Sequence, residues 1–397
     1  MQTHRTQVGI VGAGPAGLLL GHLLHLQGID SIIVENRSQE YVIERVRAGV
    51  LEQNTVDLLR EIGVSERLDQ LGLRHDGIYI RFNGERHRID MAELTGRAIT
   101  VYGQNEVVKD LIGARRATGR PLMFEIENAA IHDFESSAPA IRFRSHGEKH
   151  QIACDFIAGC DGFHGICRPS VPANAMQIYD RQYPFGWLGI LAEAPPTSHE
   201  LVYSYHDRGF ALYSMRSPKI TRLYLQCEPD ENIDKWPDDR IWAELQVRLH
   251  SKDGWAPKGG PILQKSVTGM RSFVAEPMRF GRLFLAGDAA HIVPPTGAKG
   301  LNLAVADVWV LAQGVAEFYR SSSETLLNRH SEICLRRIWR AQRFSWWMTS
   351  LLHRFNGDCD FDHHRQLAEL EYLTSSRAAK TSLAENYAGF PLSILID

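Results

Sequence analysis

One glycine-rich turn constrains the fold of this chain more than any other feature of its sequence. Residues 12–17 read G-A-G-P-A-G. An apolar, strand-like segment comes directly before the turn, and a helix-like segment follows it. A second strand-like segment then ends in an acid, Glu35. These segments predict a βαβ unit, with strands at residues 7–11 and 31–35 and a helix at residues 18–27.

The glycines of this turn have the spacing G-x-G-x-x-G, and each has a separate physical role. Gly12 permits the tight turn, Gly14 lets the backbone approach a pyrophosphate, and Gly17 lets helix and strand pack closely. The helix N-terminus would offer unpaired N–H groups to the phosphates. Glu35 is placed to bind a ribose hydroxyl, which disfavours a 2′-phosphate there. The complete context argues against a ligand-free turn and predicts an NAD-like or FAD-like nucleotide.

Length and composition limit the class of protein. A chain of 397 residues is too long to fold around one ordinary hydrophobic core, so two domains or one large domain with an inserted second are expected. A net charge of -3 gives no indication of a nucleic-acid or membrane partner. The six cysteines form no C-x-x-C pair, which favours reduced thiols in a cytoplasmic protein and no metal site. We expect no signal peptide and no apolar run long enough to span a bilayer.

The remaining segments predict a mixture of sheets and helices. Short strand-like runs from about residue 185 to residue 265 predict an antiparallel sheet. A hairpin with Gly147 in its turn is expected from residues 140–144 and 151–158. Helices are expected at residues 56–62, 107–118, 301–319 and 326–347, and over most of the last fifty residues.

Two later segments repeat the pattern of a strand followed by glycine and aspartate. Cys160, Asp161 and Gly162 follow a strand-like run, and the string L-A-G-D-A-A-H at residues 285–291 follows another. With the first turn, these segments resemble the three motifs of the class A flavoprotein monooxygenases. The resemblance implies that Asp288 contacts FAD and that Asp161 serves FAD and NADPH binding.

Longer strings extend this resemblance over nearly the whole chain. They are similar to segments of the class A members that hydroxylate 4-hydroxybenzoate, and they lie at residues 45–53, 102–104, 184–187, 294–302, 344–348 and 384–387. The implied fold is α/β with α+β elements: a Rossmann-like FAD-binding domain, an antiparallel-sheet substrate domain and C-terminal helices. The implied parts are residues 1–180 and 270–350 for the FAD-binding domain and long helices, 181–269 for the substrate sheet, and 351–397 for the C-terminal helical segment.

A phenolic acid requires a cation for its carboxylate, a base near its phenol and an apolar pocket for its ring. The resemblance implies that Arg216 binds the carboxylate, since a guanidinium holds it by two parallel hydrogen bonds. Ser214 and Tyr224 would add hydroxyl groups. Residue types alone would favour a solvated arginine at a strand edge.

The resemblance also implies a route for the phenol proton. Tyr203 would accept a hydrogen bond from the phenol, Tyr387 would be a second relay tyrosine, and His75 would pass the proton to solvent. Pro295 would place its backbone carbonyl near the substrate oxygen. Without the resemblance, two core tyrosines and a surface histidine would be the simpler interpretation.

The implied flavin contacts come from several segments of the chain. Gly300, Leu301 and Asn302 would begin a helix whose N-terminus favours negative charge on the reduced flavin. The other implied contacts with the cofactor are Arg45, Arg47, Gln104 and Arg222.

The implied reaction converts 4-hydroxybenzoate to 3,4-dihydroxybenzoate, with O2 and NADPH or NADH, through a flavin C4a-hydroperoxide. Asn36 stands where relatives often carry arginine, but Arg37, Tyr41 and Arg45 favour NADPH. A homodimer is expected. Hydroxylation of another small benzoate, a flavoprotein oxidoreductase without hydroxylation, and a non-catalytic flavoprotein remain alternatives. A disulfide oxidoreductase is disfavoured because the first cysteine is Cys154.

Overall fold

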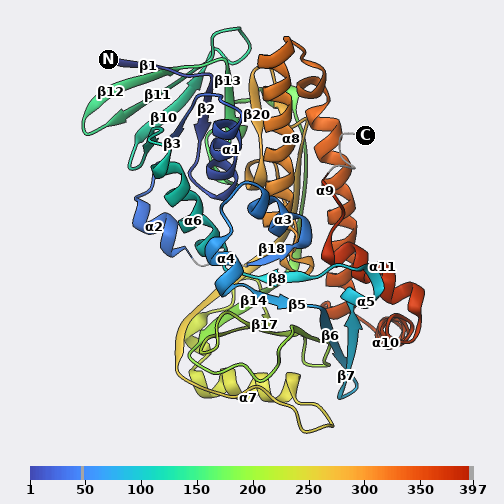
Figure 1. Cartoon of the computed structure of the whole chain (residues 1–397). Helices are drawn as coiled ribbons and strands as arrows, with labels where there is room; N and C mark the ends of the chain where they lie inside the picture. The colour runs from blue at the N-terminus through green and yellow to red at the C-terminus, as the bar shows by residue number, and fades with distance from the viewer. Residues whose placement is uncertain (46–48, 393–397) are drawn as a thin grey trace.

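A computed structural model describes residues 1–45 and 49–392 of the chain, so the predicted cofactor contact Arg47 lies outside the described residues. Figure 1 shows one half that contains the N-terminus and a second half built on a large sheet. The long helices α8 (Gly300–Ser321) and α9 (Thr325–Leu352) run along the first half, and α9 continues towards the second.

The central sheet of the first half has six strands in the order β19-β20-β13-β2-β3-β9. Its core strands are parallel: Ala158 pairs with Ile10 on one side and with Phe284 on the other. Because parallel strands end at the same edge, the three glycine motifs meet there. The strands are β2 (Val8–Val11), β3 (Ser31–Val34), β9 (Leu122–Met123), β13 (Phe156–Gly159), β19 (Arg279–Phe280) and β20 (Leu283–Leu285).

Helices and a small sheet complete the first half, and a second small sheet contributes Leu51 to the core of that half and Ile99 and Val101 to the core of the second. The predicted hairpin is confirmed only as far as Ala153, with Gly147 in its turn at a φ of 81°, because β13 joins the central sheet instead. The helices are α1 (Pro15–Leu26), α2 (Gln39–Glu44), α3 (Gln53–Glu61), α4 (Glu66–Leu71) and α6 (Gln104–Ala117). One small sheet orders β1 (Gln2–Arg5), β12 (Glu148–Ala153), β11 (Ala140–Ser145) and β10 (Glu127–His132), and the other orders β4 (Val50–Glu52), β8 (Ile99–Val101) and β5 (Leu73–His75).

The second half is built on an eight-stranded sheet in the order β21-β18-β14-β17-β16-β15-β6-β7. The predicted range 181–269 contains only part of this sheet. Strand β14 begins before residue 181 and strand β18 ends after residue 269, and β6 and β7 come from the first quarter of the chain. The sheet is also not wholly antiparallel, since β15 pairs with β6 in parallel. Its strands are β6 (Gly77–Phe82), β7 (Glu85–Asp90), β14 (Gln177–Ala192), β15 (Val202–Ser204), β16 (Ala211–Met215), β17 (Thr221–Cys227), β18 (Ile262–Glu276) and β21 (His291–Ile292).

The two faces of this sheet pack against different helices. Tyr213 and Met215 lie in the core beside α7 (Asp238–Leu249), whereas Tyr203 and Leu212 lie in a core with the C-terminal helices. This alternation is the period of two expected of a strand. The face that holds Ser214 therefore points towards α9, α10 (Asp360–Ser375) and α11 (Arg377–Ala388), with the short α5 (Met91–Thr95) beside them.

The helix α8 corrects one expectation from the sequence. It is long and apolar enough to cross a bilayer by length and composition, contrary to the prediction. However, 72% of its apolar window is buried inside the protein, where it packs against α1 and α9. The apolar character of α8 is therefore that of a core helix.

Candidate active site

The first glycine turn leaves open space where a nucleotide would lie. A Cβ on Gly12, whose φ is 106°, would lie 2.3 Å from the carbonyl oxygen of Cys160. A Cβ on Gly17 would lie 2.0 Å from the carbonyl oxygen of Gly12, whereas none of the described atoms lies within 4 Å of one on Gly14. Gly12 and Gly17 are thus needed for packing, and Gly14 faces the free N-terminus of α1. This cradle fits a pyrophosphate.

Glu35 is tied directly to this turn. Its two carboxylate oxygens accept hydrogen bonds from the backbone N–H groups of Ala13 and Arg37, each at 2.9 Å. A carboxylate oxygen has a second acceptor site, so these bonds leave room for a ribose hydroxyl. The predicted ribose contact of Glu35 therefore fits the geometry and stays a prediction.

The two aspartates of the later motifs lie at the same sheet edge. Asp161 accepts a hydrogen bond from the N–H of Cys167 at 2.8 Å, and its Oδ1 atom is buried without a partner in the described part of the chain. Burial raises the pKa of this carboxyl group. Asp288 is exposed between the buried residues Gly287 and Ala289. Both aspartates therefore have acceptor atoms available to a ligand.

The N-terminus of α8 provides backbone donors beside this edge. Leu301 and its neighbours in the first turn have N–H groups without partners inside the helix, and no described atom lies within 4 Å of a Cβ built on Gly300. The side chain of Asn302 is fully engaged, since it accepts from Glu52 and Thr55 and donates to the carbonyls of Val50 and Ala298. Any flavin contact of Asn302 would therefore use its backbone N–H.

The other predicted cofactor contacts lie on separate elements. Arg45 is exposed at the end of α2, and Gln104 begins α6. A hydrogen bond of 2.9 Å from the Tyr102 N–H to the carbonyl of Gly49 joins their two segments. The fold thus brings together two strings that the resemblance singled out.

The predicted substrate residues gather on one face of the large sheet. Tyr203 pairs with Leu212, which pairs in turn with Tyr224. Ser214 pairs with Arg222 across the same two strands. Directly paired residues share a face, and so do residues two apart. The structure therefore places Tyr203, Ser214, Tyr224 and Arg222 on one face of the sheet.

Arg216 follows the end of β16, and two nitrogens of its guanidinium have no partner. Its Nε and Nη1 atoms are buried with no hydrogen bond among the described residues, and the same holds for Arg222. Burial lowers the pKa of Arg216. Buried donor atoms without partners are unfavourable, so this geometry favours binding of an anion. Residue type alone would have favoured a solvated side chain, whereas the Nε and Nη1 atoms of Arg216 are buried.

Tyr224 lies between these two arginines. The Arg222 guanidinium lies 5.1 Å from the centre of its ring. Burial raises the pKa of Tyr224, but the charges of Arg222 and Arg216 outweigh it and leave the pKa below its usual value. Tyr224 is therefore a polarised hydroxyl group beside an anion-binding guanidinium.

Tyr203 and Tyr387 form a direct hydrogen bond in the core. Their hydroxyl oxygens are 2.5 Å apart, and each residue is 1% exposed. Burial raises the pKa of both phenols, well above the usual value for Tyr203. Both hydroxyls therefore stay protonated at neutral pH and can pass a proton along their hydrogen bond.

His75 is buried, contrary to the alternative of a surface histidine. It is 1% exposed on β5, and neither ring nitrogen has a partner among the described residues. Burial lowers its pKa to about 4, so the ring is neutral at physiological pH. It is not bonded directly to Tyr387 in the described part of the chain. A neutral imidazole keeps one acceptor nitrogen, which a proton route requires.

Pro295 lies in a turn that packs tightly on α9. It is exposed, whereas Pro294 and Thr296 beside it are buried. Its carbonyl oxygen accepts a hydrogen bond from the N–H of Ala298 at 2.9 Å. The Thr296 hydroxyl lies 2.8 Å from that of Thr349. The turn is thus fixed, and Pro295 faces outward from it.

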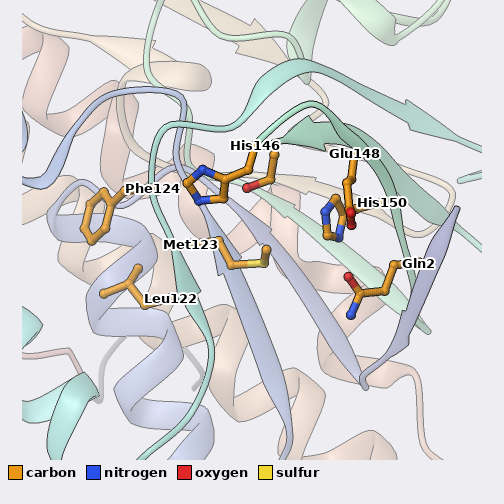
Figure 2. A pocket seen from close by; sticks show the side chains of 8 residues that line it. Gln2, Leu122, Met123, Phe124, His146, Glu148 and His150 are labelled. Atoms are coloured by element: carbon orange, nitrogen blue, oxygen red, sulfur yellow. The ribbon is translucent and has the colours of Figure 1, made fainter.

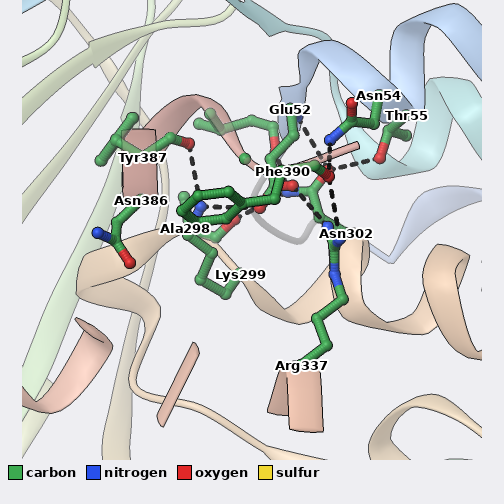
Figure 3. Close-up of polar contacts among 12 residues, drawn as sticks. Glu52, Asn54, Thr55, Ala298, Lys299, Asn302, Arg337, Asn386, Tyr387 and Phe390 are labelled. Atoms are coloured by element: carbon green, nitrogen blue, oxygen red, sulfur yellow. Dashed lines mark hydrogen bonds and ion pairs between the residues drawn. The ribbon is translucent and has the colours of Figure 1, made fainter. Parts of the chain in front are cut away.

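A buried ion cluster that the sequence did not predict holds these parts together (Figure 3). The Lys299 ammonium lies 2.7 Å from Oε1 of Glu52 and 3.0 Å from the carbonyl oxygen of Tyr387. Arg337 on α9 binds Oε2 of Glu52 at 2.8 Å. Glu52 and Lys299 lie inside the recognised strings, but they are 247 positions apart, and no local pattern pairs them.

The charges of this cluster explain its ionisation. Burial raises the pKa of Glu52, but the two cations Lys299 and Arg337 outweigh it and leave the pKa below its usual value. Burial lowers the pKa of Lys299, and Arg337 repels its charge in the same direction. Glu52 is therefore ionised at neutral pH and is the shared counter-charge of two buried cations.

A separate surface hollow of about 480 Å³ lies beside the hairpin of β11 and β12 (Figure 2). His146, Glu148 and His150 line it together with Gln2 and Met123. None of the predicted site residues lines this hollow. Across residues 1–45 and 49–392, no group of three or more histidine, cysteine or acidic residues is arranged to hold a metal ion.

Comparison with known proteins gives a family and several relatives. A family model described as an FAD binding domain matches residues 5–345. The p-hydroxybenzoate hydroxylase of Acinetobacter baylyi is 53% identical over 395 residues, which cover 99% of this chain and 98% of that protein. A 3-(3-hydroxy-phenyl)propionate/3-hydroxycinnamic acid hydroxylase of a Mycobacterium species is 27% identical over 323 residues, which cover 77% of this chain and 54% of that protein.

Solved structures share the fold at lower identity. The p-nitrophenol 4-monooxygenase of Pseudomonas putida superimposes with a TM-score of 0.83 at 18% identity, over 98% of this chain and 99% of that one. An aklavinone-11 hydroxylase solved with FAD and aklavinone gives a TM-score of 0.73 at 22% identity, over 89% of this chain and 70% of that one. These similarities support the fold.

Replacing Glu52 by Gln is expected to destabilise the protein by about 3 kcal/mol at neutral pH, since two buried cations lose their counter-charge. The folded pKa of Glu52 lies below its unfolded value of about 4.3. Its contribution is therefore complete above that value and is lost as the pH falls through the folded pKa.

Urea unfolding of the wild type and E52Q from pH 7 to pH 3 tests this expectation, with E61Q on the exposed end of α3 as the control. The difference between wild type and E52Q should shrink in acid. A difference that is constant with pH would show that Glu52 acts through packing and not through charge.

Proposed function

This chain belongs to the family of flavoproteins with the FAD binding domain that matches residues 5–345, and we propose that it hydroxylates 4-hydroxybenzoate ortho to its phenol to give 3,4-dihydroxybenzoate. The resemblance to the class A monooxygenases is thereby confirmed. One observation carries the choice of substrate. Arg216 continues the sheet face on which Tyr203 lies, and two of its buried guanidinium nitrogens lack partners, while Tyr203 bonds to Tyr387. This arrangement suits an acid at one end of a ring and a phenol at the other.

The carboxylate end of the substrate would be held by Arg216. Two parallel hydrogen bonds from its guanidinium to a carboxylate satisfy donors that are otherwise buried without partners. Ser214 and Tyr224 lie on the same face and would add hydroxyl donors. Because Arg216 is desolvated, the absence of a carboxylate would leave its charge unpaired, so ligands without one should bind poorly.

The phenol end would be activated by the two tyrosines. An unperturbed phenol has a pKa near 10, so phenolate forms at neutral pH only if its proton has a stabilised route away. Tyr203 would accept the hydrogen bond of the phenol and donate its own hydrogen to Tyr387. His75 keeps a free acceptor nitrogen at neutral pH and would receive the proton further along. A phenolate ring is electron-rich ortho to its oxygen, which is the position hydroxylated.

FAD, when bound, accepts a hydride from NAD(P)H and activates O2 for transfer of one oxygen atom. The residues present fit this cofactor. Gly14 and the N-terminus of α1 would hold the pyrophosphate, and Asp288 and Asp161 would meet the ribityl and ribose region. Backbone N–H groups at the start of α8 would stabilise negative charge on the ring. The buried packing of the Pro295 turn against α9 excludes water from this side of the site.

We propose NADPH as the preferred reductant. Ser38 caps α2 by accepting a hydrogen bond from the N–H of Tyr41, and the Arg37 guanidinium lies 5.2 Å from the centre of the Tyr41 ring. Arg37, Tyr41 and Arg45 are all exposed on this segment. Exposed arginines beside an aromatic hydroxyl are suited to a 2′-phosphate, and Asn36 adds no negative charge to oppose it.

We further propose that two copies associate in the cytoplasm. A groove of about 650 Å³ lies between α9 and the strands β14 and β18, and its rim exposes Ile178, Tyr179, Trp339 and Trp346. Exposed aromatic patches of this kind mark protein contacts.

All six cysteines are free, and five of them are buried, which favours a reducing compartment such as the cytoplasm.

Consumption of NADPH by the FAD-loaded protein should rise strongly when 4-hydroxybenzoate is added, and chromatography should show one 3,4-dihydroxybenzoate for each NADPH. NADH measured beside NADPH tests the coenzyme proposal. Stimulated consumption that yields only hydrogen peroxide would mean that 4-hydroxybenzoate is not the substrate. Without stimulation, other small benzoates become the candidates.

Replacing Arg216 by Met should weaken 4-hydroxybenzoate binding by at least about thirtyfold, because a buried charge pair is lost. Quenching of the FAD fluorescence during a titration measures this. Phenol, which lacks the carboxylate, should bind almost equally to both proteins. K219M in the exposed loop next to Arg216 is the control. An unchanged affinity of R216M for 4-hydroxybenzoate would contradict the assignment.

Sedimentation equilibrium of the wild type should give twice the mass of one chain. W339K, which places a charge on the groove, should shift it towards a single chain, since a charge in an apolar contact is costly. The matched control is F361K, because Phe361 is an exposed aromatic residue on α10, away from the groove. A wild type that sediments as a single chain would overturn the dimer.

A further inference from the structure

The carboxyl end of α11, which carries the relay residue Tyr387, is held by side chains from distant parts of the chain (Figure 3). Lys299 donates to the carbonyl of Tyr387 at 3.0 Å. Arg337 donates to the carbonyl of Phe390 at 3.1 Å, and Asn54 donates to the same oxygen. Arg97 donates to the carbonyl of Gly389 at 2.5 Å. These contacts hold the carbonyl of Tyr387 in the last turn of α11 and the carbonyls of the two residues that follow the helix.

The last four carbonyls of a helix have no partner inside the helix and usually face water. Cations are favoured at that end because they complement the helix dipole. Here the bond from Lys299 satisfies the carbonyl of Tyr387 in the last turn, and the bonds to Gly389 and Phe390 fix the chain directly after the helix. The position of that hydroxyl is therefore set by contacts outside its own helix.

Gly389 adds a steric requirement at the end of α11. Its φ is 89°, a left-handed conformation that favours glycine. A Cβ there would lie 2.0 Å from Oε2 of Glu52 and 2.5 Å from its Cδ atom. Glu52 cannot easily move away, because Lys299 and Arg337 hold both of its oxygens. Any larger residue would displace the end of α11.

We propose that Arg97, Arg337 and Gly389 are positioning residues for the proton relay: they seat the end of α11 so that the Tyr387 hydroxyl stays in hydrogen-bond contact with Tyr203. The inference rests on the proposed function, because it requires a bound phenol that loses its proton. The oxygens of Tyr203 and Tyr387 are 2.5 Å apart, and a displacement of about 1 Å takes such a pair to the limit of a hydrogen bond. Arg216, which would bind the carboxylate, follows strand β16 and would not be displaced.

Gly389→Ala is the sharpest test, because it changes no charge. The readout is the phenolate absorbance of bound 4-hydroxybenzoate, followed from pH 6 to pH 9 in the FAD-loaded protein. The apparent pKa of the bound phenol should rise by about 1 unit in G389A, since the phenolate loses a stabilising relay. The affinity for 4-hydroxybenzoate at pH 6 should change less than threefold.

Gly357→Ala is the matched control. Gly357 has a φ of 93°, and no described atom lies within 4 Å of a Cβ built on it. It therefore carries similar backbone strain without the steric conflict, and G357A should keep the phenol pKa of the wild type. An equal pKa in G389A, G357A and the wild type would overturn the proposal.

Arg97 gives a second test that does not depend on tolerance of the new methyl group. R97M removes the donor to the Gly389 carbonyl and should raise the phenol pKa, whereas R97K keeps a cationic donor and should restore part of the shift. If R97M leaves the phenol pKa unchanged, the contacts that hold the end of α11 have no influence on the proton relay through Tyr203 and Tyr387. If the wild type itself shows no phenolate with 4-hydroxybenzoate at pH 9, the proposed function fails and the inference falls with it.

Discussion

The ionised carboxylate of Glu52 is the interaction on which the site depends. It is 3% exposed and binds Lys299 from the turn before α8 and Arg337 from α9. Two buried cations would repel each other without it, and breaking such a cluster is costly. Its backbone N–H also bonds to the side chain of Asn302. One acidic side chain thus joins the turn before α8, the long helix α9 and the helix end that carries Tyr387.

The parallel sheet sets where the cofactor can lie. Because β2, β13 and β20 run in the same direction, the three motifs after them meet at one edge. Gly12 and Gly17 let the chain pack closely there, while Gly14 and the start of α8 leave open space. The binding region for FAD is therefore a consequence of strand direction and of missing side chains.

The substrate side depends on a different kind of order. Alternation along β16 and β17 separates Ser214 and Arg222 from Tyr213, so one face is polar and the other packs on α7. The C-terminal helices then cover the polar face and bring Tyr387 to Tyr203. Covering this face buries the Nε and Nη1 atoms of Arg216, which leaves two donors that an anion could satisfy.

The sequence by itself determined the nucleotide-binding turn, the alternation of the sheet face and the long helices, because these depend on neighbours within a few residues. Tertiary structure alone decided the burial of His75, the pairing of Glu52 with Lys299 across 247 positions and the entry of β6 and β7 into the large sheet. It also engaged the side chain of Asn302, a predicted cofactor contact, with the protein's own backbone. The physical reason is that local preference fixes which way a residue points, whereas long-range packing decides what lies opposite it and whether water is excluded.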